Sequence, residues 1–159
     1  MINSSEQELI ACFPIETDSP VLIDVGGHHG SVSRQFAKKG WQVIAFEPEP
    51  KNRSAFTRNL AGFSSVTCLP LAVSDVGGKK VPFYISREHY GIHSLKPFHE
   101  THTQIMEVNA VRLDEVLELF GISTVSVLKI DVEGADFPAL KGFDLDRYKP
   151  ELVMLEFMD

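Results

Sequence analysis

Short apolar runs alternate along the chain with amphipathic segments, and turn residues separate them. Val21–Val25 is apolar apart from one aspartate, and Trp41–Phe46 and Val66–Leu71 repeat the pattern. Such runs, when glycine or proline bounds them, are typical of strands that a parallel sheet buries on both faces. Val125–Asp131 and Leu152–Phe157 continue the series. The pattern therefore predicts five core strands.

Helical periodicity fills the gaps between these runs. Ser31–Lys39 carries its apolar residues on one face and is followed by Gly40, and Pro50–Ala61 is followed by Gly62. A basic last turn followed by glycine is a common helix end. Ala135–Lys141 is a third helix of this kind. Alternating strands and helices predict an α/β fold with a mainly parallel sheet, which binds ligands at the carboxyl ends of its strands.

A different stretch separates the third and fourth core strands. Lys80–Ser86 and Glu107–Arg112 are predicted to be antiparallel strands on either side of a polar loop, and Leu113–Phe120 is an amphipathic helix. The loop contains His89, His93, His99 and His102. Their spacing suits a zinc site only if the loop is helical, so loop histidines exposed to solvent are the simpler interpretation.

Composition and charge narrow the class of protein. The chain has 159 residues, 43% of them apolar, which suits one globular domain, with residues 1–19 as a polar lead-in and 20–159 as the core. A net charge of −7 disfavours binding to nucleic acid or to an acidic membrane. Two cysteines, no signal peptide and no apolar run of about 18 residues predict a soluble, cytoplasmic protein.

The first strand ends in a glycine-rich turn that opens a helix. Glycines at 26, 27 and 30 do not match the G-x-G-x-x-G spacing that cradles a diphosphate. Asp24 at the strand end would repel a diphosphate and attract a cation. S-adenosylmethionine offers two cationic groups, an ammonium and a sulfonium. A helix cap is the alternative role for Asp24.

Glu47 closes the second strand, about 20 residues after the glycines. A carboxylate at that position accepts hydrogen bonds from both ribose hydroxyls of an adenosyl ligand. Asp24 and Glu47 end adjacent strands, so together they predict an adenosyl-cofactor pocket. The alternative for Glu47 is a surface carboxylate that precedes the turn at Pro48.

Five segments occur in the order seen in FkbM-type methyltransferases. They are Asp24-Val-Gly-Gly-His-His-Gly30, Ala45-Phe-Glu-Pro-Glu-Pro50, Ala72-Val-Ser-Asp75, Leu128-Lys-Ile-Asp-Val-Glu-Gly134 and Leu155-Glu-Phe157. The chain resembles this family from about Val21 to Phe157. The resemblance implies a Rossmann-like class I methyltransferase with strand order 3-2-1-4-5. It also implies transfer of a methyl group from S-adenosylmethionine to a hydroxyl of a small molecule, sugar or natural product.

The resemblance also assigns cofactor contacts. Asp24, Gly26, His28 and Gly30 would border the methionine part, and Glu47 would bind the ribose. Ala72 and Val73, just past the third strand, would border the adenine. Because Ala72 has no polar side chain, backbone groups or Asp75 would have to bind the adenine amine.

Lys129, Asp131 and Glu133 alternate at the end of the fourth strand, which the family fold places beside the first. Methyl transfer to an alcohol needs a group that removes the hydroxyl proton, and Asp131 is the first candidate. His93 is the second, because the segment around Gly91–Leu95 resembles a lid over the acceptor. Glu133 would bind the cofactor or hold Lys129. The alternative is a structural ion-pair network, with Glu133 or Asp136 as a helix cap, and no metal is expected.

The last predicted strand lies close to the end of the chain. Class I methyltransferases usually add an antiparallel strand pair after the fifth strand, and we expect that pair to be absent or truncated here. The exposed strand edge would then be covered by missing residues or by a second copy of the chain. A non-catalytic or incomplete methyltransferase-like domain, which binds the cofactor or is part of a larger protein, is therefore the alternative function.

Overall fold

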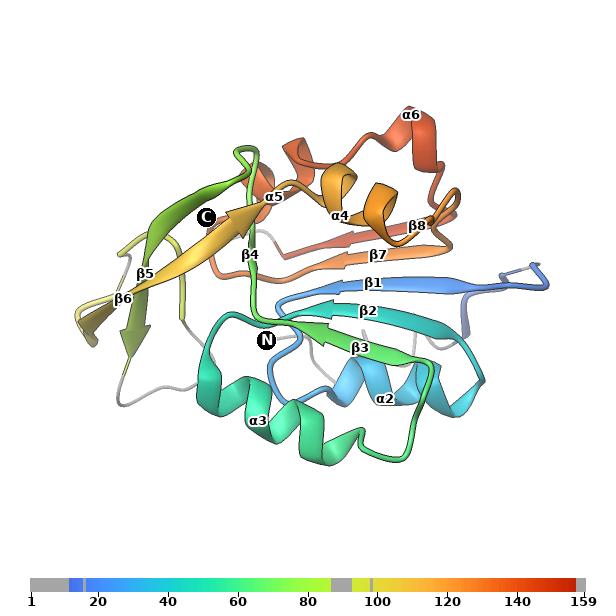
Figure 1. The fold of residues 1–159 in the computed structure, drawn as a ribbon, viewed down its shortest axis with the longest axis horizontal. Coiled ribbons are helices and arrows are strands. Elements are labelled where there is room, and N and C mark those ends of the chain that lie inside the picture. Colours follow the sequence, from blue (N-terminus) through green and yellow to red (C-terminus); the bar gives the residue numbers. More distant parts are fainter. Residues whose placement is uncertain (1–11, 16, 87–92, 98, 157–159) are drawn as a thin grey trace.

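The computed structural model describes residues 12–15, 17–86, 93–97 and 99–156. Its main feature is a five-stranded sheet in the order β3-β2-β1-β7-β8, in which every neighbouring pair is parallel (Figure 1). The strands are β1 (Val21–Val25), β2 (Gln42–Phe46), β3 (Val66–Leu69), β7 (Val127–Ile130) and β8 (Leu152–Leu155). Because β7 and β8 are the fourth and fifth core strands, the predicted order 3-2-1-4-5 is confirmed.

Helices cover both faces of this sheet, which explains why its strands are predominantly apolar (Figure 1). One face packs against α2 (Ser31–Lys38) and α3 (Pro50–Asn59), and the other against α4 (Leu113–Leu119), α5 (Asp136–Lys141) and α6 (Leu145–Tyr148). Leu22 and Ile23 are consecutive and fully buried, yet they belong to different apolar clusters, one on each face. The short helix α6 was not predicted; the Asp144 side chain caps it by accepting from Arg147 N.

A second sheet of three strands, in the order β4-β6-β5, lies beyond the carboxyl ends of the main sheet (Figure 1). Its strands are β4 (Ala72–Val73), β5 (Lys79–Ser86) and β6 (His102–Val111), and β5 and β6 are antiparallel as predicted. The strand β6 begins at His102 rather than Glu107, so part of the predicted polar loop is strand. Pairing with β5 decides this, because Ser86 and Ile85 are matched to His102 and Gln104. His89 lies outside the described residues.

One edge of the main sheet is formed by β8, and the other by β3. Among the described residues β8 pairs with β7 alone, and Leu155 at its end is 43% exposed. No helix within the described ranges is long and apolar enough to cross a membrane.

Candidate functional site

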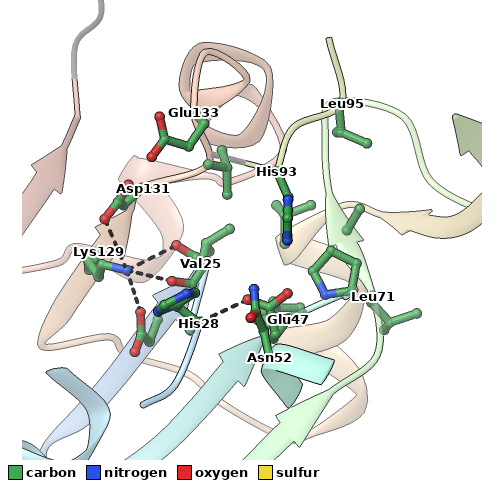
Figure 2. Close-up of a pocket in the computed structure, with 18 of the residues that line it drawn as sticks. Val25, His28, Glu47, Asn52, Leu71, His93, Leu95, Lys129, Asp131 and Glu133 are labelled. Carbon is green, nitrogen blue, oxygen red and sulfur yellow. Dashed lines mark hydrogen bonds and ion pairs between the residues drawn. The ribbon is translucent and has the colours of Figure 1, made fainter. Parts of the chain in front are cut away.

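A cavity of about 210 Å³ opens at the carboxyl ends of β1, β2 and β7, below the second sheet (Figure 2). This is the position at which open parallel sheets bind ligands. Every predicted site residue except Gly30 and Asp75 lines it. These lining residues are Asp24, Gly26, His28, Glu47, Ala72, Val73, His93, Asp131 and Glu133. Segments far apart in the sequence therefore meet at one pocket.

Gly30 and Asp75 lie outside the cavity lining. Gly30 has a left-handed backbone with φ 81°, and an added Cβ would collide with Leu60 Cδ1, so it lets α2 pack closely against α3. The Asp75 carboxylate accepts from Ser74 Oγ at 3.2 Å, and its carbonyl accepts from Arg112 Nη1 at 3.0 Å. Both contacts brace the chain after β4.

Asp24 is buried against Lys129, which arrives from the neighbouring strand. The β1–β7 register places these two residues side by side, and Lys129 Nζ lies 2.9 Å from Asp24 Oδ1. The other oxygen of Asp24 accepts from Ser33 Oγ at 2.6 Å. Gly30, not Asp24, occupies the cap position of α2, and it makes no side-chain cap bond. Asp24 therefore already has its cation within the protein, and the helix-cap alternative is wrong.

Lys129 is the one lysine or arginine among the described lining residues, and its ammonium group is fully engaged. Besides Asp24 it donates to the carbonyl of Gly26 at 2.9 Å, and Asp131 Oδ2 lies 3.8 Å away. The neighbouring carboxylates raise the pKa of Lys129 although burial acts in the opposite direction. A buried ammonium held by these groups keeps its charge, so the ion-pair network foreseen as an alternative is present.

The glycine turn folds back onto β2 rather than offering free donors to a ligand. The amides of Gly26 and Gly27 both donate to the carbonyl of Phe46 at 3.0 Å. Gly26 has φ 81°, and an added Cβ would collide with the carbonyl oxygen of Asp131. Only glycine fits at this position, where β1 and β7 end together. The turn therefore shapes the pocket floor and is not an anion cradle.

Glu47 lines the pocket beside Asn52, and backbone amides hold both of its carboxylate oxygens; Figure 2 shows the contact with His28. Its Oε2 accepts from His28 N and its Oε1 from Glu49 N, each at 2.8 Å. The side chain is 5% exposed, and burial raises its pKa to about 7 despite those two hydrogen bonds. The surface-carboxylate alternative is therefore wrong. Each carboxylate oxygen still has a second lone pair that can accept a ligand hydroxyl.

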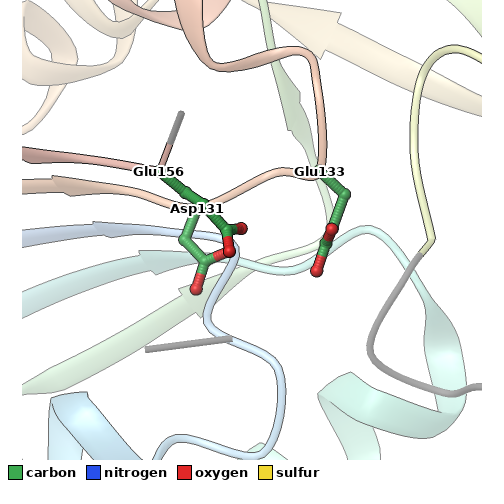
Figure 3. A group of neighbouring side chains, drawn as sticks. All are labelled: Asp131, Glu133 and Glu156. Atoms are coloured by element: carbon green, nitrogen blue, oxygen red, sulfur yellow. The ribbon is translucent and has the colours of Figure 1, made fainter. Parts of the chain in front are cut away.

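Three carboxyl groups gather near Lys129, where Asp131 and Glu133 line the cavity and Glu156 lies next to them (Figure 3). One oxygen each of Asp131, Glu133 and Glu156 lies within 4.8 Å of the others. Glu133 reaches this group through a left-handed backbone with φ 54°, an uncommon conformation for a side chain of this size. Burial raises the pKa of Asp131 to about 6 and that of Glu133 to about 7, and Glu156 adds to both shifts. Protonation thus relieves part of the repulsion in this cluster.

The segment His93–Leu95 forms one wall of the cavity and is tied to two other elements. The backbone of Ser94 exchanges two hydrogen bonds with Tyr84 on β5, at 2.7 and 3.1 Å. The fully buried Ser94 Oγ donates to the carbonyl of Glu133 at 2.6 Å. Ser94 thereby links the second sheet to the loop that carries the carboxyl cluster.

Some lining residues were missed by sequence reasoning. Asn52 and Phe83 line the cavity but carry no motif of their own. Asn52 follows Glu47 closely, at the start of α3, and that proximity was the available signal. Phe83 reaches the pocket from β5 only because the second sheet folds over the first, which no local pattern reveals.

The side chains that line the pocket indicate which cofactor fits it. Lys129 is committed to protein oxygens, so the described part of the lining offers no free lysine or arginine to a diphosphate. Glu47 suits a ribose diol, and Leu71, Ala72 and Val73 provide an apolar wall for a planar base. Asp131 and Glu133 give the remaining end a negative potential that suits a sulfonium or an ammonium. The residues therefore fit S-adenosylmethionine better than a dinucleotide.

The raised pKa of Glu47 predicts how the stability of the ligand-free protein depends on pH. The folded state binds a proton up to about pH 7, whereas the unfolded carboxyl releases it near 4.5. Stability therefore falls as pH rises through this window. Between pH 6 and 8, Glu47 should lower the free energy of unfolding by about 1 kcal/mol. Urea unfolding of wild type and Glu47→Gln at both pH values isolates the effect. An equal pH slope in the two proteins would contradict it.

Comparison with known proteins shows which family this chain resembles. A family model described as the methyltransferase FkbM domain matches residues 24–159. The 2-O-methyltransferase NoeI of Sinorhizobium fredii is 23% identical over 165 residues, which cover 91% of this chain and 66% of that protein. Methyltransferase 1 of Beauveria bassiana is 28% identical over 158 residues, which cover 85% of this chain and 61% of that protein. The chain spans less than two thirds of the length of these relatives.

Solved structures share the fold at low sequence identity. The precorrin-6y C5,15-methyltransferase of Geobacter metallireducens has a TM-score of 0.54 and 14% identity, with coverage of 96% of this chain and 62% of that one. An rRNA methylase of Streptococcus thermophilus has a TM-score of 0.51 and 13% identity, with coverage of 93% and 67%. The fold is thus the Rossmann-like methyltransferase fold. Together with the match over residues 24–159, this shows that the chain belongs to the FkbM methyltransferase domain family.

Proposed function

We propose that this domain binds S-adenosylmethionine and transfers its methyl group to a hydroxyl oxygen of a small molecule or glycan. The observation that carries the proposal is Glu47, a buried carboxylate whose two oxygens are aimed by backbone amides into a cavity at the strand ends. Membership of a methyltransferase family supports the reaction class. The similarity to NoeI, which is named a 2-O-methyltransferase, supports oxygen as the acceptor atom.

The proposed cofactor contacts follow the pocket from one end to the other. Glu47 accepts from the ribose hydroxyls, and Ala72 and Val73 pack against the adenine. Gly26 and His28 border the methionine part, close to the Asp24–Lys129 pair. Asp24 acts by fixing Lys129 rather than by binding the ligand ammonium, because the Lys129 ammonium already supplies its counterion at 2.9 Å. Glu133 contributes negative charge next to the sulfonium.

Asp131 is the proposed general base. When bound, the cofactor supplies an electrophilic methyl group on a positively charged sulfur. The Asp131 carboxylate lines the same cavity and accepts the hydroxyl proton as the new oxygen–carbon bond forms. Its pKa of about 6 leaves it mostly ionised at neutral pH while making it a stronger base than an exposed aspartate. Lys129, 3.8 Å away, stabilises the ionised form.

Calorimetric titration with S-adenosylhomocysteine, and separately with NAD, tests the cofactor part of the proposal. We expect binding of the first ligand alone, and no heat with S-adenosylhomocysteine would overturn the proposal. Release of S-adenosylhomocysteine over a panel of sugar and phenolic acceptors then tests the transfer. Binding without turnover across the panel would favour the alternative, a cofactor-binding module that depends on further protein for catalysis.

Asp131→Asn tests the base in the same assay. The variant should lower turnover by about 100-fold or more while binding of S-adenosylhomocysteine stays within a few-fold of wild type. Full turnover of Asp131→Asn across the pH range would show that Asp131 is not the base.

A further inference from the structure

His93 is a buried polar side chain with one ring nitrogen facing the cavity. The residue is 8% exposed and lines the pocket with Phe83 and Leu95. Its Nε2 is shielded from solvent and has no hydrogen-bond partner among the described residues. Because leaving a buried polar atom unpaired is costly, such an atom in a ligand cavity indicates a partner supplied by the ligand.

The other ring nitrogen determines which chemistry Nε2 offers. His93 Nδ1 accepts a hydrogen bond from the backbone amide of Ser86 at 3.2 Å. An amide is only a donor, so Nδ1 must be unprotonated, and in the neutral ring the proton then sits on Nε2. Burial lowers the pKa of His93 and so favours the neutral ring. Nε2 is consequently a hydrogen-bond donor, and His93 in this state is not a general base.

The position of the ring selects the part of the ligand that it meets. In Figure 2 the His93 ring points into the pocket toward the end that contains Glu47 and Leu71, away from Lys129. The charged groups that act on the pKa of His93 include Glu49 and Lys51. Both lie close to Glu47, at the start of α3. Asp131 and Glu133 stand at the other end of the cavity. His93 therefore faces the proposed ribose region.

We propose that His93 is a positioning residue for the nucleoside, whose Nε2–H donates to a ribose hydroxyl oxygen of the bound ligand. A hydroxyl group both donates and accepts, and Glu47 can only accept when it is ionised, which is the case above about pH 7. Glu47 lies below and His93 above in the view of Figure 2. Glu47 would accept the proton of a ribose hydroxyl, and His93 would donate to the oxygen of the same hydroxyl. Because Ser94 ties the same segment to the carbonyl of Glu133, a docked ribose would also brace the loop carrying the carboxyl cluster. This inference rests on the proposed function.

A cycle of variants and ligands tests the contact. His93→Phe keeps a ring of similar size but has no N–H. It should raise the Kd of S-adenosylhomocysteine by about 3- to 10-fold, the usual range for one hydrogen bond. The matched ligand is the 2′,3′-dideoxyribose analogue, which wild type and His93→Phe should bind equally within about 2-fold. His93→Gln, which carries an N–H at the same distance along the side chain, should restore part of the affinity for the full ligand.

Nitrogen-15 NMR of histidine-labelled wild-type protein checks the tautomer without any substitution. Nε2 should be protonated and Nδ1 unprotonated at neutral pH, and S-adenosylhomocysteine should shift the Nε2–H signal. A proton on Nδ1, or an equal loss by His93→Phe with both ligands, would overturn the inference. So would unchanged ligand affinity with a raised KM for the acceptor. If wild type binds neither ligand, the proposed function fails first, whereas the NMR result still reports on the tautomer.

Discussion

Replacing Lys129 with methionine is expected to lower the free energy of unfolding by about 3–5 kcal/mol, which is a large share of the stability of one domain. Methionine fills a similar volume, so the loss would not come from a cavity. It would come from Asp24, which is 1% exposed and would keep only the hydroxyl of Ser33 as a partner. Removing one member of a buried ion pair leaves an uncompensated charge in a medium that solvates it poorly.

Urea unfolding followed by circular dichroism measures this loss, and two variants serve as controls. Lys80→Met removes an exposed lysine from β5 and should change stability by less than about 0.5 kcal/mol. The double variant Asp24→Asn/Lys129→Met removes both charges, so it should be more stable than Lys129→Met alone. If the double variant were as unstable as Lys129→Met or less stable, the pair would not be coupled in the way the 2.9 Å contact indicates.

Glu47→Ala is expected to raise the Kd of S-adenosylhomocysteine by about 10- to 150-fold, equivalent to about 1.5–3 kcal/mol. The substitution removes both proposed ribose contacts. It also leaves the amides of His28 and Glu49 without the oxygens that now accept from them. The substitution would therefore remove hydrogen bonds to the ligand and to the backbone of the pocket at the same time. The apolar wall that packs against the adenine base would stay in place.

Calorimetry with matched variants separates these contributions. Glu107→Gln, on the exposed face of β6, should bind like wild type. Glu47→Gln keeps the side-chain shape but offers one acceptor oxygen to two amides, so its affinity should fall between those of Glu47→Ala and wild type. Circular dichroism confirms that each protein is folded. Wild-type affinity in Glu47→Ala would show that the ligand does not use this carboxylate.

The main sheet was largely predictable because its signals are local. Runs such as Val21–Val25 are apolar except for Asp24 and buried at every position, which is typical of a sheet covered on both faces. Glycines and charged last turns placed the helix ends close to where the structure has them. Where a signal was weak, prediction failed. The first three residues of β6, His102 to Gln104, are polar, and only their pairing with Ser86 and Ile85 makes them strand.

The pocket residues were predictable as a set, and their individual partners were not. Asp24 lies near the end of β1, and Glu47 and Asp131 directly follow β2 and β7, so their positions at the strand ends bring them to one cavity. Asp24 was expected to attract a ligand cation, yet the protein supplies that cation from Lys129, a partner set by the β1–β7 register. Glu156 joins Asp131 and Glu133 because β8 lies beside β7.

Local patterns along the chain thus specified the strands, their buried faces and the edge of the sheet at which the cavity forms. These features were predictable because apolar periodicity and the position of glycines act over only a few residues. Protonation and hydrogen-bond roles depend on contacts between distant segments. Glu47 has a raised pKa because the fold buries it, and His93 becomes a donor because the amide of Ser86 takes its Nδ1. Burial and backbone partners are properties of the assembled molecule, so only the tertiary structure decided which groups are ionised and which way each one donates.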